Sequence, residues 1–353
     1  MNVSATETAP PSDHPPIGIV WSEDMPFVQH AGGSETYTAL QIKQLVKLGY
    51  AVNFYAFGKT KESDLGQLDI PIHTPETRLD LSKADDTFIF PIVPDYEIDD
   101  LRRNSHVILH VPATGMQPLD EEYFRKNGVG IHTPIVTSTF MAGHWQEVLD
   151  LQQPPSVVYP PTDPAYGLQS RPTQRNSPPR ALFAGRPTPE KGIFVLFASL
   201  ESAPLTDEEF DMTCVKTINH DGGTEIINAL FDAHPGIRTT DARPDPASMA
   251  ELYSQHDVVV MPSIWTEPFG MISVEAQHAG CRVVASDIGG LPETDCGSLV
   301  LTAPNDYKAL AQSISAALRL GPLSQQEREA ATTKFTVEDS VSALLRAIEL
   351  EAR

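Results

Sequence analysis

From Ile17 onward, short runs of β-branched and aromatic residues alternate with longer segments of helical apolar periodicity. The first strand is predicted at 17–21, a helix follows to about Leu48, and the next strand begins at Val52. Four further strands are predicted at 87–91, 106–111, 134–139 and 157–159. Strands that alternate with helices are typical of a parallel sheet covered by helices. The pattern therefore predicts an α/β protein.

The same alternation resumes after a proline-rich stretch at 160–180, which we interpret as a linker because proline and polar residues resist both helix and sheet. A helix is predicted over 192–202 and a closing amphipathic helix from Val337 to Ile348. The remaining strands are predicted at 181–184, 212–218, 237–241, 258–262, 282–286 and 298–301. Two α/β domains are expected, at 17–165 and 181–335, joined by a linker at 166–180 and preceded by a flexible tail at 1–16. Ligands of such sheets bind outside the carboxyl ends of the strands.

Composition narrows the class of protein. The chain has 353 residues and a formal net charge of −22. This negative charge disfavours binding to nucleic acid and stable anchoring on anionic lipid. Three cysteines are too few for a disulfide framework and too scattered for a zinc site. The N-terminal tail lacks the apolar core of a signal peptide, and no apolar run approaches the roughly 20 residues of a membrane helix. A soluble cytoplasmic protein is expected.

Two carboxylates lie eight positions apart after the predicted strand at 258–262. Glu267 falls in the loop and Glu275 about one turn into the next helix. Backbone amides near Gly270, Met271 and Ile272 would be unpaired at the start of this helix and would favour an anion such as phosphate. The alternative is an ordinary helix start stabilised by acidic residues.

Two cations follow the strand at 181–184. Arg186 ends that strand and Lys191 opens the next helix, so both can converge on a diphosphate. The alternatives are a salt bridge from these cations to Glu190 or a solvated face.

Two weaker candidates lie in the first half of the chain. Gly32 and Gly33 occupy the turn before the first helix, where a phosphate-binding turn would lie, although a turn capped by Ser34 explains them equally. His110 closes the strand at 106–111, where it could form a hydrogen bond with a sugar hydroxyl or polarise a reacting group as a catalytic residue. A core histidine bonded to the backbone is the commoner fate of such a residue.

Together these motifs resemble retaining glycosyltransferases of family 4, which have the GT-B fold. Glu267 and Glu275 match that family's E-x7-E motif, Gly185 to Gly192 its G-R-x-x-x-x-K-G loop, and Gly32 to Glu35 its N-terminal glycine loop. The resemblance implies two Rossmann-like domains with parallel sheets facing across a cleft. It also implies that the C-terminal helix, at 336–353, packs back on the first domain.

The resemblance further implies a role for each motif residue. Arg186 and Lys191 would bind the donor diphosphate. Glu275 would accept hydrogen bonds from the ribose hydroxyls, and Glu267 would hold the sugar hydroxyls. The remaining donor contacts would come from the amides of Phe269, Gly270, Met271 and Ile272, from the backbone at Gly33, and from His110. No metal or other cofactor is expected, because cations and helix amides can stabilise the leaving diphosphate.

The implied function is transfer of a hexose-type sugar from a UDP- or GDP-sugar to an acceptor hydroxyl, with retention, in polysaccharide, glycoconjugate or natural-product synthesis. A small soluble or oligosaccharide acceptor is favoured over a lipid. Two alternatives stay open: a catalytically silent module that binds a nucleotide sugar or glycan, and a different GT-B enzyme such as an epimerase or phosphorylase. Residues 219–224 depart from the family's glycine-rich turn near the donor base, so the base is not predicted.

Overall fold

The computed structural model describes residues 15–21, 27, 32–56, 68–74, 86–91, 105–109, 134–171, 174–202, 210–216, 224–241 and 245–349. Within them the chain forms two compact units. The described residues up to Ile135, together with those from Val341, form the first unit, and Val136–Ser340 form the second. The C-terminal helix α12 (Val337–Glu349) therefore begins in the second unit and continues in the first.

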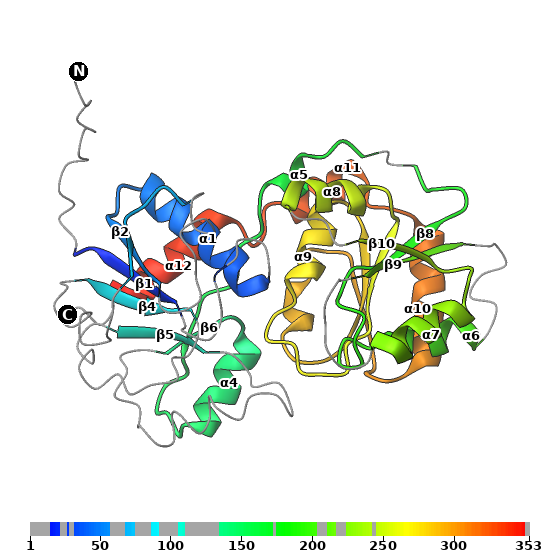
Figure 1. The fold of residues 1–353 in the computed structure, drawn as a ribbon, viewed down its shortest axis with the longest axis horizontal. Coiled ribbons are helices and arrows are strands. Elements are labelled where there is room, and N and C mark those ends of the chain that lie inside the picture. Colours follow the sequence, from blue (N-terminus) through cyan, green and yellow to red (C-terminus); the bar gives the residue numbers. More distant parts are fainter. Residues whose placement is uncertain are drawn as a thin grey trace. The chain divides into compact units, whose positions relative to one another are not determined.

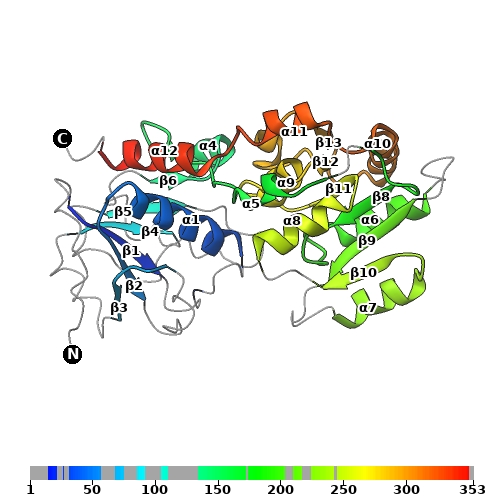
Figure 2. The same cartoon turned by 90° about the horizontal axis from the view of Figure 1, so that it is seen from above.

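One sheet contains seven strands in the order β3-β2-β1-β4-β5-β6-β7. Its strands are β1 (Ile17–Trp21), β2 (Val52–Ala56), β3 (Ile72–His73), β4 (Thr87–Phe90), β5 (Ser105–Leu109), β6 (Ile135–Val136) and β7 (Ser156–Val157). The first strand lies between β2 and β4 and is parallel to both (Figure 2). The rings of Trp21, Phe27 and Phe54 meet edge to face, with centroids 4.8 and 5.2 Å apart. Helix α1 (Gly33–Lys47) follows β1, as the apolar stripe predicted.

The second sheet contains six parallel strands in the order β10-β9-β8-β11-β12-β13. Its strands are β8 (Arg180–Phe183), β9 (Asp211–Lys216), β10 (Arg238–Asp241), β11 (Val258–Met261), β12 (Arg282–Ser286) and β13 (Leu299–Thr302). The helices of this unit are α4 (Thr139–Val148), α5 (Ala165–Leu168), α6 (Ile193–Glu201), α7 (Thr224–Ala233), α8 (Pro246–Ser254), α9 (Met271–His278), η3 (Leu291–Thr294), α10 (Tyr307–Leu320) and α11 (Gln325–Ala331).

Alternate residues of the central strand β11 enter two different cores. Val258 and Val260 pack with α6, α7 and α10, whereas Val259 and Met261 pack with α5, α8 and α9. Figure 1 shows α6, α7 and α10 together on one side of this sheet and α5 and α8 on the other. A strand buried on both faces needs apolar residues at every position, which explains the continuous Val-Val-Val-Met run.

Most predicted strands are confirmed, with ends that coincide with the observed ends or differ by one or two residues. The prediction at 134–139 was too long, because strand β6 ends at Val136 and α4 begins at Thr139, with Ser138 as its N-cap. Strand β3, only two residues long, was not predicted. The expected tail at 1–16 lies almost wholly outside the described residues.

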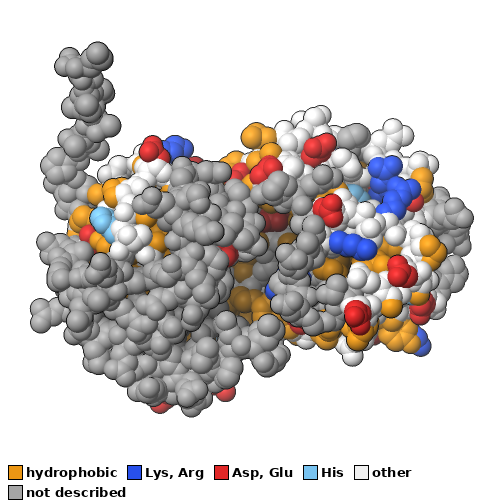
Figure 3. Space-filling view, in the orientation of Figure 1, with side chains coloured by type: hydrophobic (Ala, Val, Ile, Leu, Met, Phe, Trp, Pro, Cys, Tyr) orange, Lys and Arg blue, Asp and Glu red, His pale blue; other side chains and the backbone are white. Residues whose placement is uncertain are grey.

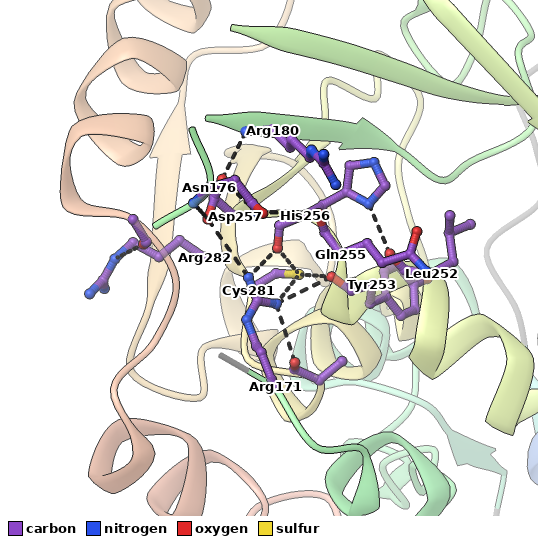
Figure 4. Close-up of polar contacts among 12 residues, drawn as sticks. Arg171, Asn176, Arg180, Leu252, Tyr253, Gln255, His256, Asp257, Cys281 and Arg282 are labelled. Carbon is purple, nitrogen blue, oxygen red and sulfur yellow. Dashed lines mark hydrogen bonds and ion pairs between the residues drawn. The ribbon is translucent and has the colours of Figure 1, made fainter. Parts of the chain in front are cut away.

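The proline-rich stretch is more ordered than its composition indicated. It contains the short helix α5, so the expectation that it forms no helix was wrong. Arg171 from this stretch is buried, and its guanidinium donates to the carbonyl oxygens of Tyr253, His256 and Ala279 at the ends of α8 and α9 (Figure 4). These carbonyls carry the negative ends of the two helix dipoles, which a buried cation stabilises. Arg171 is therefore fixed to the second unit.

A buried carboxylate completes this attachment. Asp257, just before β11, accepts hydrogen bonds from the backbone N–H of Arg180 at 2.8 Å and from Nδ2 of Asn176 at 3.0 Å. Its other oxygen lies 4.0 Å from the Arg171 guanidinium (Figure 4).

All three cysteines are buried and form no disulfide bond, and the sequence predicted no disulfide framework. Among the described residues, no helix combines the length and apolar character that a membrane span requires.

Candidate functional site

The candidate site lies where the strand order of the six-stranded sheet reverses. Strand β8 is the first of this sheet along the chain and β11 the fourth, yet the two are neighbours. In an open parallel sheet, ligands bind outside the carboxyl ends of the strands at such a reversal of strand order. The loop after β8 holds Arg186 and Lys191, and the loop after β11 holds Glu267. The topology therefore brings the two predicted motifs together.

Lys191 and Glu267 form an ion pair at this edge of the sheet. The Nζ of Lys191 lies 2.6 Å from Oε1 of Glu267, whose side chain is almost fully buried. The hydroxyl of Ser263 donates to the same oxygen at 2.7 Å. The ammonium also lies 4.5 Å from the centroid of the Trp265 ring. Among the described residues no hydrogen bond reaches the Oε2 of Glu267, so this oxygen is available to a ligand.

A glycine allows the two loops to approach. Gly192 has a φ of 78°, and a Cβ on it would lie 1.8 Å from the carbonyl oxygen of Pro262. Two residues earlier, the carbonyl oxygen of Glu190 accepts from the backbone N–H groups of Ile264 at 3.0 Å and Trp265 at 3.3 Å. Only glycine fits both this backbone conformation and this contact. The loops after β8 and β11 are thus joined backbone to backbone.

Helix α9 begins at this site without a side-chain cap. Its N-cap is Gly270, with a φ of 112°. By contrast, the N-caps of α8 and α10 are Asp245 and Asp306, whose carboxylates accept backbone hydrogen bonds. An uncapped helix start carries unpaired N–H groups and the positive end of the helix dipole. The backbone at Met271 and Ile272 is therefore suited to an anion. Helix α6 likewise begins without a side-chain cap, at Gly192.

Glu275 lies one turn into α9 between two tyrosines. The hydroxyl of Tyr253 donates to its Oε2 at 3.3 Å, and Tyr166 also forms a hydrogen bond with this carboxyl group. Burial raises the pKa of Glu275 to about 7, against the smaller opposing effect of the two hydroxyl groups. Close to neutral pH this carboxyl group therefore exists in both its neutral and its ionised form.

The other predicted site residues lie in different surroundings. Arg186 is exposed and forms no ion pair with the described residues. Phe269 is buried, and its ring packs against those of Tyr159 and Phe335 with centroids 5.7 and 5.2 Å away. Only its backbone can therefore reach a ligand. His110 lies outside the described residues.

The structure contradicts one of the two interpretations of the glycine turn before α1, namely a turn capped by Ser34. The N-cap of α1 is Gly32, with no side-chain hydrogen bond, so the interpretation that Ser34 caps the helix was wrong. Gly33 is the first helical residue. Glu35 is buried, and its carboxyl group forms a hydrogen bond with its own backbone N–H, although burial raises its pKa overall. The interpretation that Lys191 forms a salt bridge with Glu190 was also wrong, because Lys191 pairs with Glu267.

Several residues of the site were not predicted from the sequence. Ser263 and Trp265 precede Glu267 in the same loop and fix the carboxylate and the ammonium. Tyr166 lies in the stretch interpreted as a linker, and Tyr253 lies in α8. The position of Ser263, four residues before Glu267 in the same loop, was the one signal in the sequence that these two residues could be in contact. The tyrosines come from distant segments, so no local pattern marks them.

Charge on the visible surface is mixed. In Figure 3 the described Lys and Arg side chains of the second unit lie among Asp and Glu side chains and form no continuous basic surface. Among the residues that the structure describes, no three His, Cys, Asp or Glu side chains gather as a metal site would require. The need for a metal or other cofactor is not tested by this observation, and the expectation of none stays a prediction.

Comparisons with known proteins agree with these motifs. Residues 178–319 match the family described as glycosyl transferases group 1. A segment of 117 residues is 34% identical to the D-inositol 3-phosphate glycosyltransferase of Corynebacterium diphtheriae and covers 31% of this chain and 27% of that protein. The chain therefore aligns with only about a quarter of this curated relative.

Solved structures resemble the chain over nearly its whole length. A glycosyltransferase from Rickettsia africae superposes with a TM-score of 0.73 at 19% identity, over 96% of this chain and 99% of that one. The Anabaena protein HepE, solved with UDP and glucose, superposes with a TM-score of 0.67 at 17% identity, over 94% and 99%. At these identities the likeness establishes the fold alone, and the predicted GT-B fold is confirmed.

Proposed function

Since residues 178–319 match the family of glycosyl transferases group 1, we propose that this protein transfers a hexose-type sugar from a nucleoside diphosphate sugar to an acceptor hydroxyl. The proposal includes retention of configuration at the anomeric carbon. One observation carries it: Lys191, Glu267 and the uncapped start of α9 follow the neighbouring strands β8 and β11. This observation supports a site in which a cation, a carboxylate that can accept a hydrogen bond from a sugar hydroxyl, and amides that can bind an anion lie at one edge of the sheet.

The diphosphate would bind at the cationic part of this site. Lys191 supplies an ammonium held within the site, and the exposed guanidinium of Arg186 supplies a second cation on the same loop. The amides of Met271 and Ile272, at the uncapped helix start, supply hydrogen-bond donors. As the glycosidic bond breaks, negative charge accumulates on the β-phosphate. Preorganised cations and amides stabilise that charge more than they stabilise the bound substrate.

The two glutamates would bind the two sugars of the donor. The free Oε2 of Glu267 accepts from a hydroxyl of the transferred sugar, assisted by the amides of Phe269 and Gly270. Glu275 accepts from the ribose hydroxyls in its ionised form, because hydrogen bonds to a carboxylate are stronger than those to a carboxylic acid. The backbone at Gly33 and the side chain of His110 are proposed to complete the donor site.

The proposed transfer uses no protein nucleophile. The acceptor hydroxyl attacks the anomeric carbon on the face from which the diphosphate leaves, so the configuration is retained. An oxygen of the departing diphosphate takes the acceptor's proton. The bond from the anomeric carbon to the phosphate oxygen breaks and the bond to the acceptor oxygen forms. Lys191 and the helix amides act on the leaving group, and no metal is needed in this scheme.

We further propose a donor carrying uridine or guanosine and a small soluble or oligosaccharide acceptor in the cytoplasm. HepE, which shares the fold, binds UDP and glucose, which supports a uridine donor. The net charge of −22 disfavours a long residence on anionic lipid. The products would belong to polysaccharide, glycoconjugate or natural-product synthesis.

The first test is thermal unfolding of the purified chain with UDP, GDP, ADP and the corresponding sugars. A ligand present at 100 times its dissociation constant stabilises by about 2.7 kcal/mol, which raises the Tm by several degrees. We expect a shift with UDP or GDP that falls to about half or less in Lys191→Met and is kept in Lys308→Met, a matched change on α10. The absence of any shift in the wild-type protein would contradict the proposal.

Turnover is the second test. The binding nucleotide's glucose, galactose, mannose and N-acetylglucosamine derivatives are incubated with a panel of sugar and small-alcohol acceptors. NMR of the product then reports the anomeric configuration, and we expect the α-anomer from an α-linked donor. An inverted product would refute retention while leaving sugar transfer intact. Binding without turnover on any acceptor would favour the silent binding module.

A further inference from the structure

Glu293, on η3, binds the start of a helix that is distant in the sequence. Its Oε2 accepts from the backbone N–H of Thr139 at 2.7 Å, and its Oε1 accepts from that of Phe140 at 2.7 Å. These are the first two helical residues of α4. The hydroxyl of Tyr159 donates to the same carboxylate at 2.8 Å. One carboxylate therefore satisfies three donors, two of them at the positive end of a helix dipole.

The start of α4 also contacts the loop that carries Glu267. The hydroxyl of Ser138, the N-cap of α4, donates to the carbonyl oxygen of Pro268 at 2.6 Å and accepts from the backbone N–H of Met141 at 3.2 Å. Ser138 is fully buried. Pro268 directly follows Glu267, so a shift of this helix start would displace the peptide group next to the sugar-binding carboxylate.

Tyr159 forms a second contact with the same loop. Its ring lies 5.7 Å from the ring of Phe269 and 5.5 Å from that of Phe335, centroid to centroid. Its hydroxyl, bound to Glu293, lies 3.0 Å from Oγ1 of Thr139. Tyr159, which donates a hydrogen bond to Glu293, thus packs against the ring of Phe269. Phe269 directly precedes Gly270, the N-cap of α9.

The segment that carries Glu293 touches the loop from its own side. The backbone N–H of Gly290, directly before η3, donates to the carbonyl oxygen of Glu267 at 2.8 Å. A Cβ on Gly290 would lie 2.5 Å from the carbonyl oxygen of Pro268, so the two backbones are in close contact. Residues 267–269 therefore lie between the Gly290 segment and the start of α4, and Glu293 joins these two supports.

We propose that Glu293 is a positioning residue for the donor loop 267–270. It holds the start of α4 and Tyr159 against Pro268 and Phe269, and so fixes Glu267 and the first amides of α9 in the geometry that binds the donor. The positioning itself follows from the contacts, whereas its effect on a nucleotide rests on the function proposed above. Glu293 touches no substrate in this scheme. The competing interpretation is a helix cap that contributes stability alone.

The test compares Glu293→Ala with Glu327→Ala. Glu327 is a matched control, because its carboxylate accepts three hydrogen bonds, from the backbone N–H and hydroxyl of Ser324 and from Arg282, at the start of another helix, α11. Two quantities are measured on the full chain, well below the Tm of either variant. The first is hydrogen–deuterium exchange of peptides covering 264–273, and the second is the dissociation constant for UDP and GDP.

We expect Glu293→Ala to speed amide exchange in 264–273 at least tenfold and to weaken binding of the nucleotide at least tenfold. Glu327→Ala should change neither, even if it lowers the Tm as much. Tyr159→Phe, which removes one hydrogen bond and keeps the ring, should give a smaller effect of the same kind. Unchanged exchange at 264–273 in Glu293→Ala would overturn the inference and leave Glu293 as a helix cap.

Failure of the proposed function is recognised separately. If the wild-type chain binds no nucleotide but Glu293→Ala still speeds exchange of the loop, the positioning role stands and the donor assignment fails. If the wild-type chain binds UDP or GDP and Glu293→Ala affects neither quantity, the positioning role fails and the donor assignment stands.

Discussion

The Nζ of Lys191 lies 2.6 Å from Oε1 of Glu267, so a cation from the loop after β8 neutralises a carboxylate from the loop after β11. The partners are separated by 76 residues in the sequence. Because the Glu267 side chain is almost fully buried, its charge needs this partner, and Lys191 is held in place before any ligand binds. The pair thus stabilises the fold and, in the proposed function, holds the groups that bind the donor. Substitutions can separate these two effects.

Lys191→Met is expected to weaken nucleoside diphosphate binding at least tenfold and to destabilise the fold by about 3 kcal/mol, since Glu267 would stay buried without its counter-charge. Lys191→Met with Glu267→Gln should recover most of the stability but none of the affinity. Urea unfolding and calorimetric titration with UDP and GDP measure the two quantities. Recovery of affinity in the double variant would contradict a direct role for the ammonium.

Gly192→Ala is expected to cost several kcal/mol of stability and to abolish donor binding, because the new Cβ would overlap the carbonyl oxygen of Pro262. Gly49→Ala is the matched control. Gly49 also has a positive φ, 89°, but nothing lies within 4 Å of the Cβ position, so only the backbone penalty of about 1–2 kcal/mol applies. Equal losses of Tm in the two variants would show that the loop yields to the added methyl group.

Donor affinity should depend on pH through Glu275. The pKa of this group is raised to about 7, so its ionised fraction falls about tenfold between pH 8 and pH 6, and the dissociation constant should rise by up to that factor. A UDP- or GDP-sugar is the suitable probe, because its diphosphate does not titrate in this range. Glu275→Gln should bind more weakly at pH 8 and show no such pH dependence. An unchanged slope in this variant would exclude Glu275 as the titrating group.

The same pKa gives a prediction for stability. A carboxyl group whose folded pKa of about 7 exceeds its unfolded value of 4.5 lowers the free energy of unfolding as the pH rises through that window. Glu275→Gln removes this loss, so the variant should gain about 1–2 kcal/mol relative to wild type on going from pH 5 to pH 8. Glu329→Gln, on the exposed face of α11, should show no such gain when both are unfolded in urea.

His278 should destabilise the fold in acid. Burial lowers the pKa of His278 from 6.5 to about 4, so the unfolded chain binds a proton that the folded chain excludes between these values. Stability contributed by the neutral ring is complete above pH 6.5 and is lost progressively as the pH falls toward 4, by about 2 kcal/mol at pH 5. His278→Gln should flatten this loss in urea unfolding at pH 7.5 and pH 5, whereas a change at the exposed His73 should not. A loss of equal size in His278→Gln would assign the acid sensitivity to other groups.

Local pattern was sufficient for most of the fold. Strand β11 is a continuous apolar run, and β1, β2, β8 and β12 are largely apolar. The loops and helices between them follow in the order that a parallel sheet requires. The positions of Arg186, Lys191, Glu267 and Glu275 relative to those strands could also be predicted, because a loop residue keeps its place when the strand before it is fixed. Hence the sequence alone determined which segments carry the candidate chemistry.

Only the tertiary structure decided which of these groups meet. Lys191 pairs with Glu267 rather than with its neighbour Glu190, because the close contact of Gly192 with Pro262 brings the two loops together. Arg171, in a stretch that resembles a free linker, is buried because it meets the carbonyl ends of two helices. Glu293 reaches α4 across 154 positions of sequence. Periodicity depends on neighbours along the chain, whereas these contacts depend on the packing of separate elements.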